Sequence, residues 1–118
     1  MLRYVKYVIM IEYFERINKN VEQENLKARI YNIINDIPKG YVLTYGILAN
    51  LVGLPNNSRL VARLISVSPE GVNSHRIVNS QGRTAPSWAK QRILLENEGV
   101  KFKENGNVDL KNFLWKPI

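Results

Sequence analysis

The sequence predicts a mostly α-helical domain: a winged-helix-like helix-turn-helix with a small C-terminal β-hairpin. Two short segments with helical spacing of apolar residues flank a Gly-Leu-Pro turn at residues 53–55. A longer helical pattern precedes them at residues 21–36. Near the end of the chain, Asn105 and Gly106 separate two short alternating segments, which is typical of a hairpin.

Length and composition predict one folded domain over residues 21–118, preceded by an N-terminal extension at residues 1–20. The chain has 118 residues, 45% of them hydrophobic and 23% charged, as in ordinary globular proteins. It has no cysteine and one histidine, His75, so we expect no disulfide, metal site or cofactor. The apolar run at residues 7–14 is too short to span a bilayer and has no signal-peptide cleavage site. We therefore expect no membrane partner and an intracellular protein, cytoplasmic in a prokaryote or nuclear in a eukaryote.

Positive charge is concentrated in the middle of the chain. Between Pro38 and Arg92, seven basic residues stand against one acid, Glu70, so this region carries six of the chain's seven net positive charges. Its basic residues are Lys39, Arg59, Arg63, Arg76, Arg83, Lys90 and Arg92. Such regional charge is typical of a surface that binds a polyanion.

The first predicted helix covers residues 21–36. Its apolar residues recur at helical spacing: Leu26, Ile30, Ile33 and Ile34. Glu22 and Glu24 lie in the first turn, where acidic side chains interact favourably with the helix dipole. Pro38 and Gly40 end the pattern.

The helix-turn-helix is predicted from its caps and its two apolar stripes. Thr44 is a suitable N-cap for the first helix, Gly53 for its left-handed stop, and Asn56 or Asn57 for the start of the second helix. The apolar residues of the first helix are Ile47, Leu48 and Leu51, and those of the second are Leu60, Val61, Leu64 and Ile65. Two short helices joined by a tight turn are typical of a DNA-binding motif.

The opposite face of the second helix carries small and basic residues. They are Ser58, Arg59, Ala62, Arg63 and Ser66. Small residues let a helix approach a groove closely, and arginines contact phosphates or enter the duplex. Tyr45, at the start of the first helix, is placed to direct its hydroxyl to a phosphate or a base. The pattern alone is equally consistent with an ordinary solvated helix face.

The remaining chain predicts one helix and the hairpin. Residues 72–80 are expected to form a short extended stretch or a turn, and Ser87 offers a cap for a helix at residues 88–97. That helix is expected to turn Ile93, Leu94 and Leu95 inward. Valine and leucine alternate with polar residues around Asn105-Gly106, and the tail is expected to pack back through Leu114 and Trp115.

The adjacent pair Ser74-His75 gives only a weak hydrolase signal. Neighbouring residues rarely face each other, and neither a G-x-S-x-G elbow nor an oxyanion motif is present. A structural His75, paired with a carboxylate such as Glu98, is the favoured interpretation.

Three separated motifs carry a family resemblance. They are IPKGYVLTYGILA at residues 37–49, SHRIVNSQGR at residues 74–83 and ENEGVKF at residues 96–102. The first two resemble the DNA-binding domain of O6-alkylguanine-DNA alkyltransferases, in which IPxGxVxTYGxIA leads into a helix-turn-helix and PCHRV contains the cysteine that accepts the alkyl group. ENEGVKF, together with the ending VDLKNFLWKP at residues 108–117, is more similar to the alkyltransferase-like proteins, which have tryptophan or another residue in place of that cysteine.

The resemblance implies a role for the helix-turn-helix residues. Tyr45 matches the tyrosine that helps rotate the damaged nucleotide out of the stack, and Arg59 matches the arginine that fills the vacated space. Ala62 matches the small residue that lets the recognition helix lie in the minor groove. The predicted DNA-binding residues are Tyr45, Ser58, Arg59, Ala62 and Arg63.

The resemblance also implies a lesion pocket. Ser74 occupies the alkyl-acceptor position, and His75 is the histidine that pairs with Glu98. Ser87 and Trp88 fall in the loop that closes over the flipped base. The predicted pocket residues are Tyr45, Val72, Ser74, His75, Ser87 and Trp88.

Two departures from the family pattern favour recognition without repair. Asn73 replaces the usual proline, and Ser74 replaces cysteine or tryptophan. Alkyl transfer from guanine O6 requires a soft, ionised nucleophile, which a cysteine thiol with a pKa of about 8.5 can supply and a serine hydroxyl cannot. We therefore assign no catalytic residue.

The predicted function is non-enzymatic recognition of O6-alkylguanine in duplex DNA, by minor-groove docking and base flipping, in a monomeric protein. The resemblance implies that the lesion is then passed to nucleotide excision repair. One alternative is an alkyltransferase whose acceptor cysteine has been changed to Ser74; Asn73 and the LWKP ending count against it. Another is a helix-turn-helix transcription regulator, which the absence of an Asn or Gln base reader on the outward face disfavours.

Overall fold

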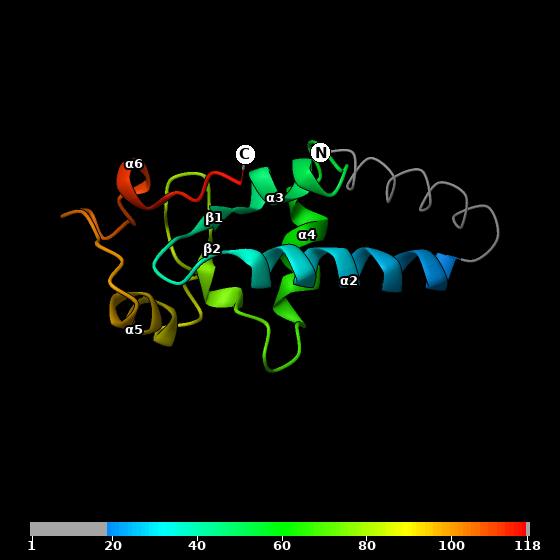
Figure 1. Ribbon diagram of the computed structural model, residues 1–118, viewed down its shortest axis with the longest axis horizontal. Coiled ribbons are helices and arrows are strands. Elements are labelled where there is room, and N and C mark those ends of the chain that lie inside the picture. The colour runs from blue at the N-terminus through cyan, green and yellow to red at the C-terminus, as the bar shows by residue number, and fades with distance from the viewer. Residues whose placement is uncertain (1–18, 118) are drawn as a thin grey trace.

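Helix α2 (Lys19–Asp36) packs against the helix-turn-helix in the computed structural model, which describes residues 19–117 (Figure 1). The apolar residues that predicted this helix are all buried: Leu26, Ile30, Ile33 and Ile34. Residues 1–18 lie outside the described part of the chain. The predicted extension at residues 1–20 therefore stays a prediction.

The helix-turn-helix consists of α3 (Tyr45–Leu51) and α4 (Ser58–Ser66). Thr44 caps α3 as predicted, because its Oγ1 accepts a hydrogen bond from the Ile47 N–H at 3.2 Å. Gly53 has a φ of 82°, which confirms the left-handed stop. Asn57 is the N-cap residue of α4, as predicted, although its side chain makes no capping hydrogen bond.

A two-stranded parallel sheet lies at the centre of the described fold (Figure 1). Strand β1 (Leu43–Thr44) pairs with β2 (Ile77–Val78), and α3 and α4 lie in the connection between them. Within residues 72–80, predicted to be extended or a turn, the chain forms a short 3-10 helix, η1 (Ser74–Arg76), before β2. On its other side the β1 segment pairs with the tail, since the Trp115 N–H donates to the Val42 carbonyl at 2.8 Å. The tail therefore packs back as predicted.

The C-terminal hairpin is reduced to one antiparallel bridge, between Phe102 and Val108. The Asp109 N–H still donates across the hairpin to the Lys101 carbonyl at 3.1 Å, while the Val108 N–H donates outward to the carbonyl of Gly82 at 2.8 Å. The next residues form a one-turn helix, α6 (Leu110–Phe113), where the alternating pattern predicted a strand. The N–H groups of the following turn fold back onto the Asp109 carbonyl.

Helix α5 (Lys90–Asn97) begins later than predicted and turns a different face inward. Ser87 does not cap it. Ile93 and Leu94 are 57% and 38% exposed, so the prediction that both point inward is wrong. The buried residues of this helix are Gln91 and Leu95, four positions apart on one face.

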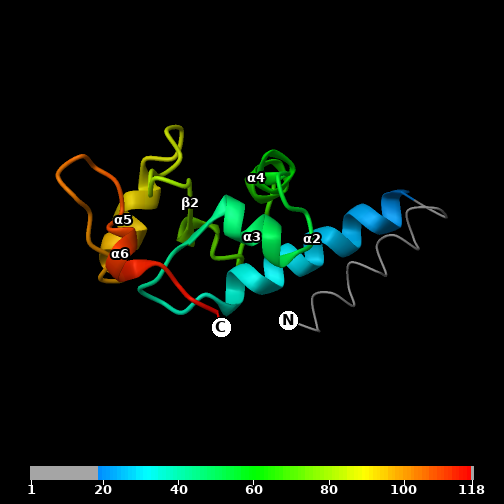
Figure 2. The same ribbon diagram turned by 90° about the horizontal axis from the view of Figure 1, so that it is seen from above.

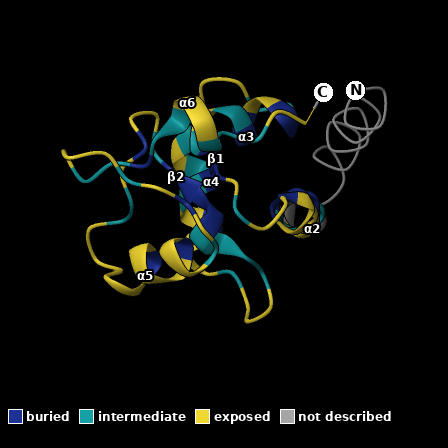
Figure 3. Cartoon of the chain, turned by 60° about the vertical axis from the view of Figure 1, so that its left-hand side comes forward, coloured by how far each residue is buried: buried dark blue, intermediate teal, exposed yellow. Residues whose placement is uncertain are grey.

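The sheet separates two hydrophobic cores. The paired residues Leu43 and Ile77 belong to the larger core, formed with α2, α3 and α4. Val78, on the other face of the sheet, belongs to the smaller core with Leu95 and Val108. Figure 2 shows α2, α3 and α4 on one side of β2 and α5 and α6 on the other. In Figure 3, buried and exposed residues alternate along α4 and α5, as expected for amphipathic helices that cover these cores.

No helix among residues 19–117 is long and apolar enough to cross a membrane.

Candidate nucleic-acid interface and pocket

Helix α4 presents a basic face to solvent. Val61, Leu64 and Ile65 are buried, whereas Arg59 and Arg63 are exposed. The helix sequence SRLVARLIS contains no acidic residue, and within residues 19–117 neither arginine takes part in an ion pair. These two guanidinium groups are therefore available to an external anion.

Helix α2 fixes the position of this face. The Tyr31 hydroxyl donates to the Leu64 carbonyl of α4 at 2.9 Å, and Arg29 donates to the Val52 carbonyl at the end of α3 at 3.3 Å. Both hydrogen bonds join residues far apart in the sequence. They hold the helix-turn-helix against α2 as a rigid platform.

A cavity of about 360 Å³ lies beside α4. This volume falls at the lower end of the range typical of small-molecule pockets. Its lining residues are Tyr45, Ala62, Ile65, Ser66, Ser68, Ser74, Ala85, Ser87, Trp88 and Gln91. Because Ala62 and Ser66 belong to α4, the cavity adjoins the basic face of that helix.

The cavity wall is rich in hydroxyl groups and carries no charge. Ser68 and Ser74 share a hydrogen bond with an Oγ–Oγ distance of 2.7 Å. The Ser66 hydroxyl donates to the Arg63 carbonyl at 2.6 Å. Burial raises the pKa of Tyr45, so its phenol remains a neutral hydrogen-bond donor across the physiological pH range.

Gln91 joins two sides of the cavity and is only 1% exposed. Its Nε2 donates to the carbonyls of His75 and Ile77, at 3.1 and 2.7 Å, and its Oε1 accepts from the Ala85 N–H at 2.7 Å. The amide thereby ties the segment after Ser74 to the loop before α5. A glutamine in an amphipathic helix is ordinarily expected to face solvent, so the pattern gave no signal for this role.

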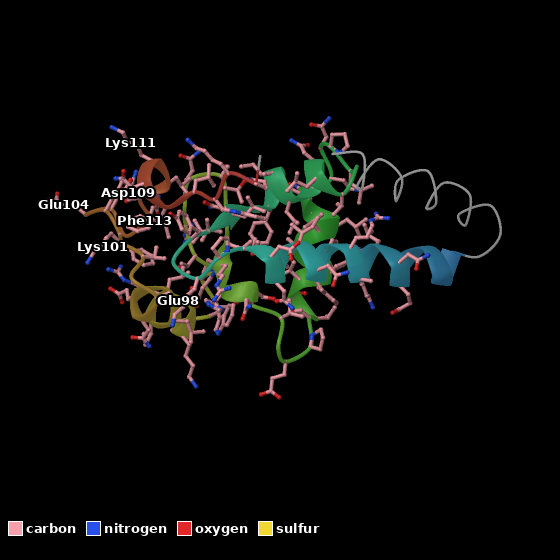
Figure 4. All side chains as sticks on the ribbon, viewed as in Figure 1. Glu98, Lys101, Glu104, Asp109, Lys111 and Phe113 are labelled. Carbon is pink, nitrogen blue, oxygen red and sulfur yellow. The ribbon has the colours of Figure 1, made fainter. Side chains whose placement is uncertain are left out.

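Glu98 is the centre of a buried polar cluster behind the cavity. It contacts His75 Nε2 through Oε2 at 2.8 Å and accepts hydrogen bonds from Arg76 and the Gly40 N–H. Burial alone would raise the pKa of Glu98, but the hydrogen bonds from Arg76, His75 and Gly40 lower it to about 2. The carboxylate is therefore ionised at neutral pH. Figure 4 shows Glu98 on the inner side of the molecule, whereas Glu104 and Lys111 extend outward.

The backbone of Asn73 is hydrogen-bonded to helix α2. Its backbone N–H donates to Asn35 Oδ1 of α2 at 3.0 Å. The proline expected at this position from the resemblance has no N–H and could not form this hydrogen bond. Helix α2 therefore positions the segment that leads into Ser74.

The structure brings together most of the predicted pocket residues. Tyr45, Ser74, Ser87 and Trp88 line the cavity. Val72 packs against the larger core, and the His75 ring is directed to Glu98, so neither is part of the wall. The Glu98 contact is the pairing that the resemblance implied. Wall residues outside the predicted pocket set are Ala62, Ile65, Ser66, Ser68, Ala85 and Gln91.

Of the predicted DNA-binding residues, Arg59 and Arg63 are exposed and Tyr45, Ser58 and Ala62 are partly exposed. All belong to α3 or α4. Two of these predicted DNA-binding residues, Tyr45 and Ala62, also line the cavity.

The sequence matches the family model described as "6-O-methylguanine DNA methyltransferase, DNA binding domain" over residues 25–100. Among curated proteins, it is 36% identical over 102 residues to the "DNA base-flipping protein" of Escherichia coli strain K12, covering 82% of this chain and 79% of that protein. It is 30% identical over 108 residues to "Alkyltransferase-like protein 1" of Schizosaccharomyces pombe, covering 82% of this chain and 100% of that protein.

The fold is similar to that of a solved protein–DNA complex. The structure of S. pombe Atl1 bound to damaged DNA containing O6-carboxymethylguanine superposes with a TM-score of 0.70 at 31% sequence identity. The match covers 80% of this chain and 97% of that one.

Proposed function

We propose that this chain, which belongs to the family of the 6-O-methylguanine DNA methyltransferase DNA-binding domain, recognises O6-alkylguanine in duplex DNA without removing the alkyl group. The observation that carries this proposal is the junction between an uncharged cavity and the arginine face of α4. A duplex held by that face would have its bases beside the cavity entrance. Its relatives, which include a DNA base-flipping protein and a protein solved in complex with damaged DNA, support the proposal.

Docking would place α4 in the minor groove. Ala62 and Ser58 are small enough to let the helix axis approach the groove floor, and Arg63 is placed to contact a phosphate. Arg59, one turn before Arg63, would enter the duplex. This geometry requires a rigid recognition helix, which the Tyr31 hydrogen bond to Leu64 supplies.

The damaged base would leave the stack and occupy the cavity. Extrusion of a base costs a few kcal/mol, and least when pairing is already poor, as for an alkylated guanine. Tyr45 lies at the first position of α3 and in the cavity wall, so it can contact the base on its way in. Trp88 provides an aromatic surface for stacking.

The position that the resemblance assigns to the alkyl acceptor is unsuited to the transfer reaction here. Ser74 shares a hydrogen bond with Ser68, and among residues 19–117 its hydroxyl makes no hydrogen bond to the His75 ring, which contacts Glu98 through Nε2. A neutral serine hydroxyl without a base is a poor nucleophile. The chain would therefore hold the lesion unaltered, as a monomer inside the cell, and present it to another pathway such as nucleotide excision repair.

The test is a titration of the protein into two fluorescent duplexes that differ only by O6-methylguanine or guanine, at one salt concentration. We expect tighter binding to the damaged duplex, with the methyl group still on the DNA when the complex is analysed by mass spectrometry. Equal affinity for both duplexes would leave only a basic DNA-binding domain.

The alternatives give different results in related measurements. A gain in protein mass when the Ser74→Cys variant is incubated with methylated DNA would indicate an alkyltransferase that has lost its acceptor. A footprint at one defined undamaged sequence would indicate a transcription regulator.

A further inference from the structure

We infer that the Ser68–Ser74 hydroxyl pair gives the cavity a preference for O6 adducts that end in a neutral hydrogen-bonding group, such as 2-hydroxyethyl, over alkyl groups of the same size. This inference rests on the proposed function, because it assumes that a damaged guanine enters the cavity. It identifies the class of adduct and the two side chains that select it.

The composition of the wall motivates the inference. Five of the ten lining residues carry a hydroxyl group: Tyr45, Ser66, Ser68, Ser74 and Ser87. Ala62, Ile65, Ala85 and Trp88 provide apolar surface suited to a base and to methylene groups. The wall thus combines an apolar part with a row of neutral hydroxyls, rather than forming a purely apolar alkyl pocket.

The hydrogen bond between Ser68 and Ser74 leaves one hydroxyl donor unused. Each serine hydroxyl has one O–H and two acceptor lone pairs. In the 2.7 Å contact one hydroxyl donates to the other, so the O–H of the accepting serine has no partner within the pair. An adduct that ends in a hydroxyl can accept this hydrogen bond and can donate to a remaining lone pair.

Two of the other polar side chains of the wall are already engaged within the protein, and within residues 19–117 the hydroxyls of Tyr45 and Ser87 make no hydrogen bond to a second hydroxyl. The Ser66 hydroxyl already donates to the Arg63 carbonyl, and the Gln91 amide is engaged in three hydrogen bonds to the backbone. The Ser68–Ser74 pair therefore offers an unused O–H donor and unused lone pairs at one point of the wall. Ser74 also occupies the position that the resemblance assigns to the alkyl acceptor, which the O6 substituent would face.

The absence of a charged side chain in the wall limits the preference to neutral groups. None of the ten lining residues is ionised at neutral pH. A carboxylate adduct would be removed from water without a positive partner, which is costly. An apolar adduct would leave the remaining O–H of the Ser68–Ser74 pair without a partner, so it should bind less tightly than a hydroxyl-terminated adduct.

The test compares duplexes that contain O6-(2-hydroxyethyl)guanine or O6-propylguanine, two adducts with the same number of non-hydrogen atoms. Unmodified and O6-methylguanine duplexes are measured alongside. For the unaltered protein we expect the hydroxyethyl duplex to bind about 3- to 10-fold more tightly than the propyl duplex, which is the value of one ordinary hydrogen bond. In the Ser68→Ala/Ser74→Ala double variant this ratio should fall to about 1, whereas each single variant keeps one serine hydroxyl that can bond to the adduct and should lower the ratio less.

The control is Ser80→Ala, which removes an exposed serine hydroxyl outside the cavity and should leave the ratio unchanged. Equal affinity of the unaltered protein for both adducts, or a ratio that survives both cavity substitutions, would overturn the inference. If the methylated and unmodified duplexes bind equally, the proposed function itself fails. The two failures are therefore distinguishable in one set of titrations.

Discussion

Arg76 donates two hydrogen bonds to the carboxylate of Glu98, from Nε to Oε1 at 3.0 Å and from Nη2 to Oε2 at 2.8 Å. The same guanidinium donates through Nη1 to the carbonyl of Ile37 at 2.9 Å, and His75 contacts the second carboxylate oxygen. One buried carboxylate thus joins η1, the segment after α2 and the end of α5. This cluster supports the cavity from behind.

The Glu98 cluster predicts acid sensitivity. Its carboxyl has a pKa of about 2 in the folded protein against an ordinary value of 4.5, so the unfolded chain binds the proton more tightly. The stabilisation is complete above about pH 4.5 and is lost as the pH falls toward 2, because protonation then favours the unfolded state. We expect Glu98 to contribute on the order of 3 kcal/mol at pH 7, measured by urea unfolding across this pH range.

Glu98→Gln should lower stability at pH 7 and flatten the pH dependence between 4.5 and 2. Glu104→Gln, which changes an exposed glutamate, is the matched control and should keep the profile of the unaltered protein. An unchanged slope in Glu98→Gln would assign the acid sensitivity to other carboxylates.

Gln91→Leu should destabilise the fold by about 2–4 kcal/mol, because the substitution leaves three buried backbone groups without their partner. Those groups are the Ala85 N–H and the carbonyls of His75 and Ile77. Gln81→Leu changes an exposed glutamine and should stay within about 0.5 kcal/mol. Chemical denaturation of the two variants gives the comparison, and equal stability would show that the buried amide makes no net contribution.

Gly82→Ala should cost about 2 kcal/mol more than Gly106→Ala. Both glycines have a φ of 85°, so both substitutions carry the same backbone strain. At Gly82 the added Cβ would also lie 2.6 Å from the Val108 carbonyl oxygen, whereas at Gly106 it meets nothing within 4 Å. Thermal unfolding of both variants measures the cost of the contact between the added Cβ and the Val108 carbonyl. Equal losses of stability would mean that the backbone at Val108 moves away at no cost.

Arg59→Ala should weaken binding to an O6-methylguanine duplex about tenfold, because Arg59 is expected to fill the space that the flipped base leaves. Lys103→Ala removes the same charge from an exposed position outside the helix-turn-helix and should change the affinity about twofold at most. Titrations at one salt concentration compare them. Equal losses of affinity in the two variants would show that Arg59 contributes only through its positive charge.

The helix-turn-helix was predictable from the sequence because its signals are local. The Thr44 cap and the Gly53 stop are confirmed, and the apolar stripe of α4 is buried except for Leu60, which is partly exposed. Helix α2 was predictable for the same reason, since its inward residues recur at a regular spacing.

The C-terminal half was less predictable because tertiary contacts decide it. Helix α5 turns Gln91 inward, against its polarity, since the amide satisfies backbone groups from two distant segments. Ile93 and Leu94 are displaced outward as a result. Similarly, Val108 donates its N–H to the carbonyl of Gly82, 26 positions earlier, and the chain then forms α6 in place of the predicted strand.

The pocket was only partly predictable. Ser74 and Trp88 followed from the family resemblance, whereas Ser68 lies in a loop without a motif and enters the wall through its hydrogen bond with Ser74. A side-chain pair of this kind cannot be read from spacing. His75 was predicted both in the pocket and in a pair with Glu98, and the structure shows only the second.

The most direct test of the account is whether the damaged base leaves the stack in the complex. A duplex with 2-aminopurine next to O6-methylguanine reports unstacking as an increase in fluorescence. We predict an increase that saturates at the same protein concentration as binding and that is strongly reduced in Arg59→Ala. Tight binding to the damaged duplex with no fluorescence change would contradict base flipping and would place recognition in the groove itself.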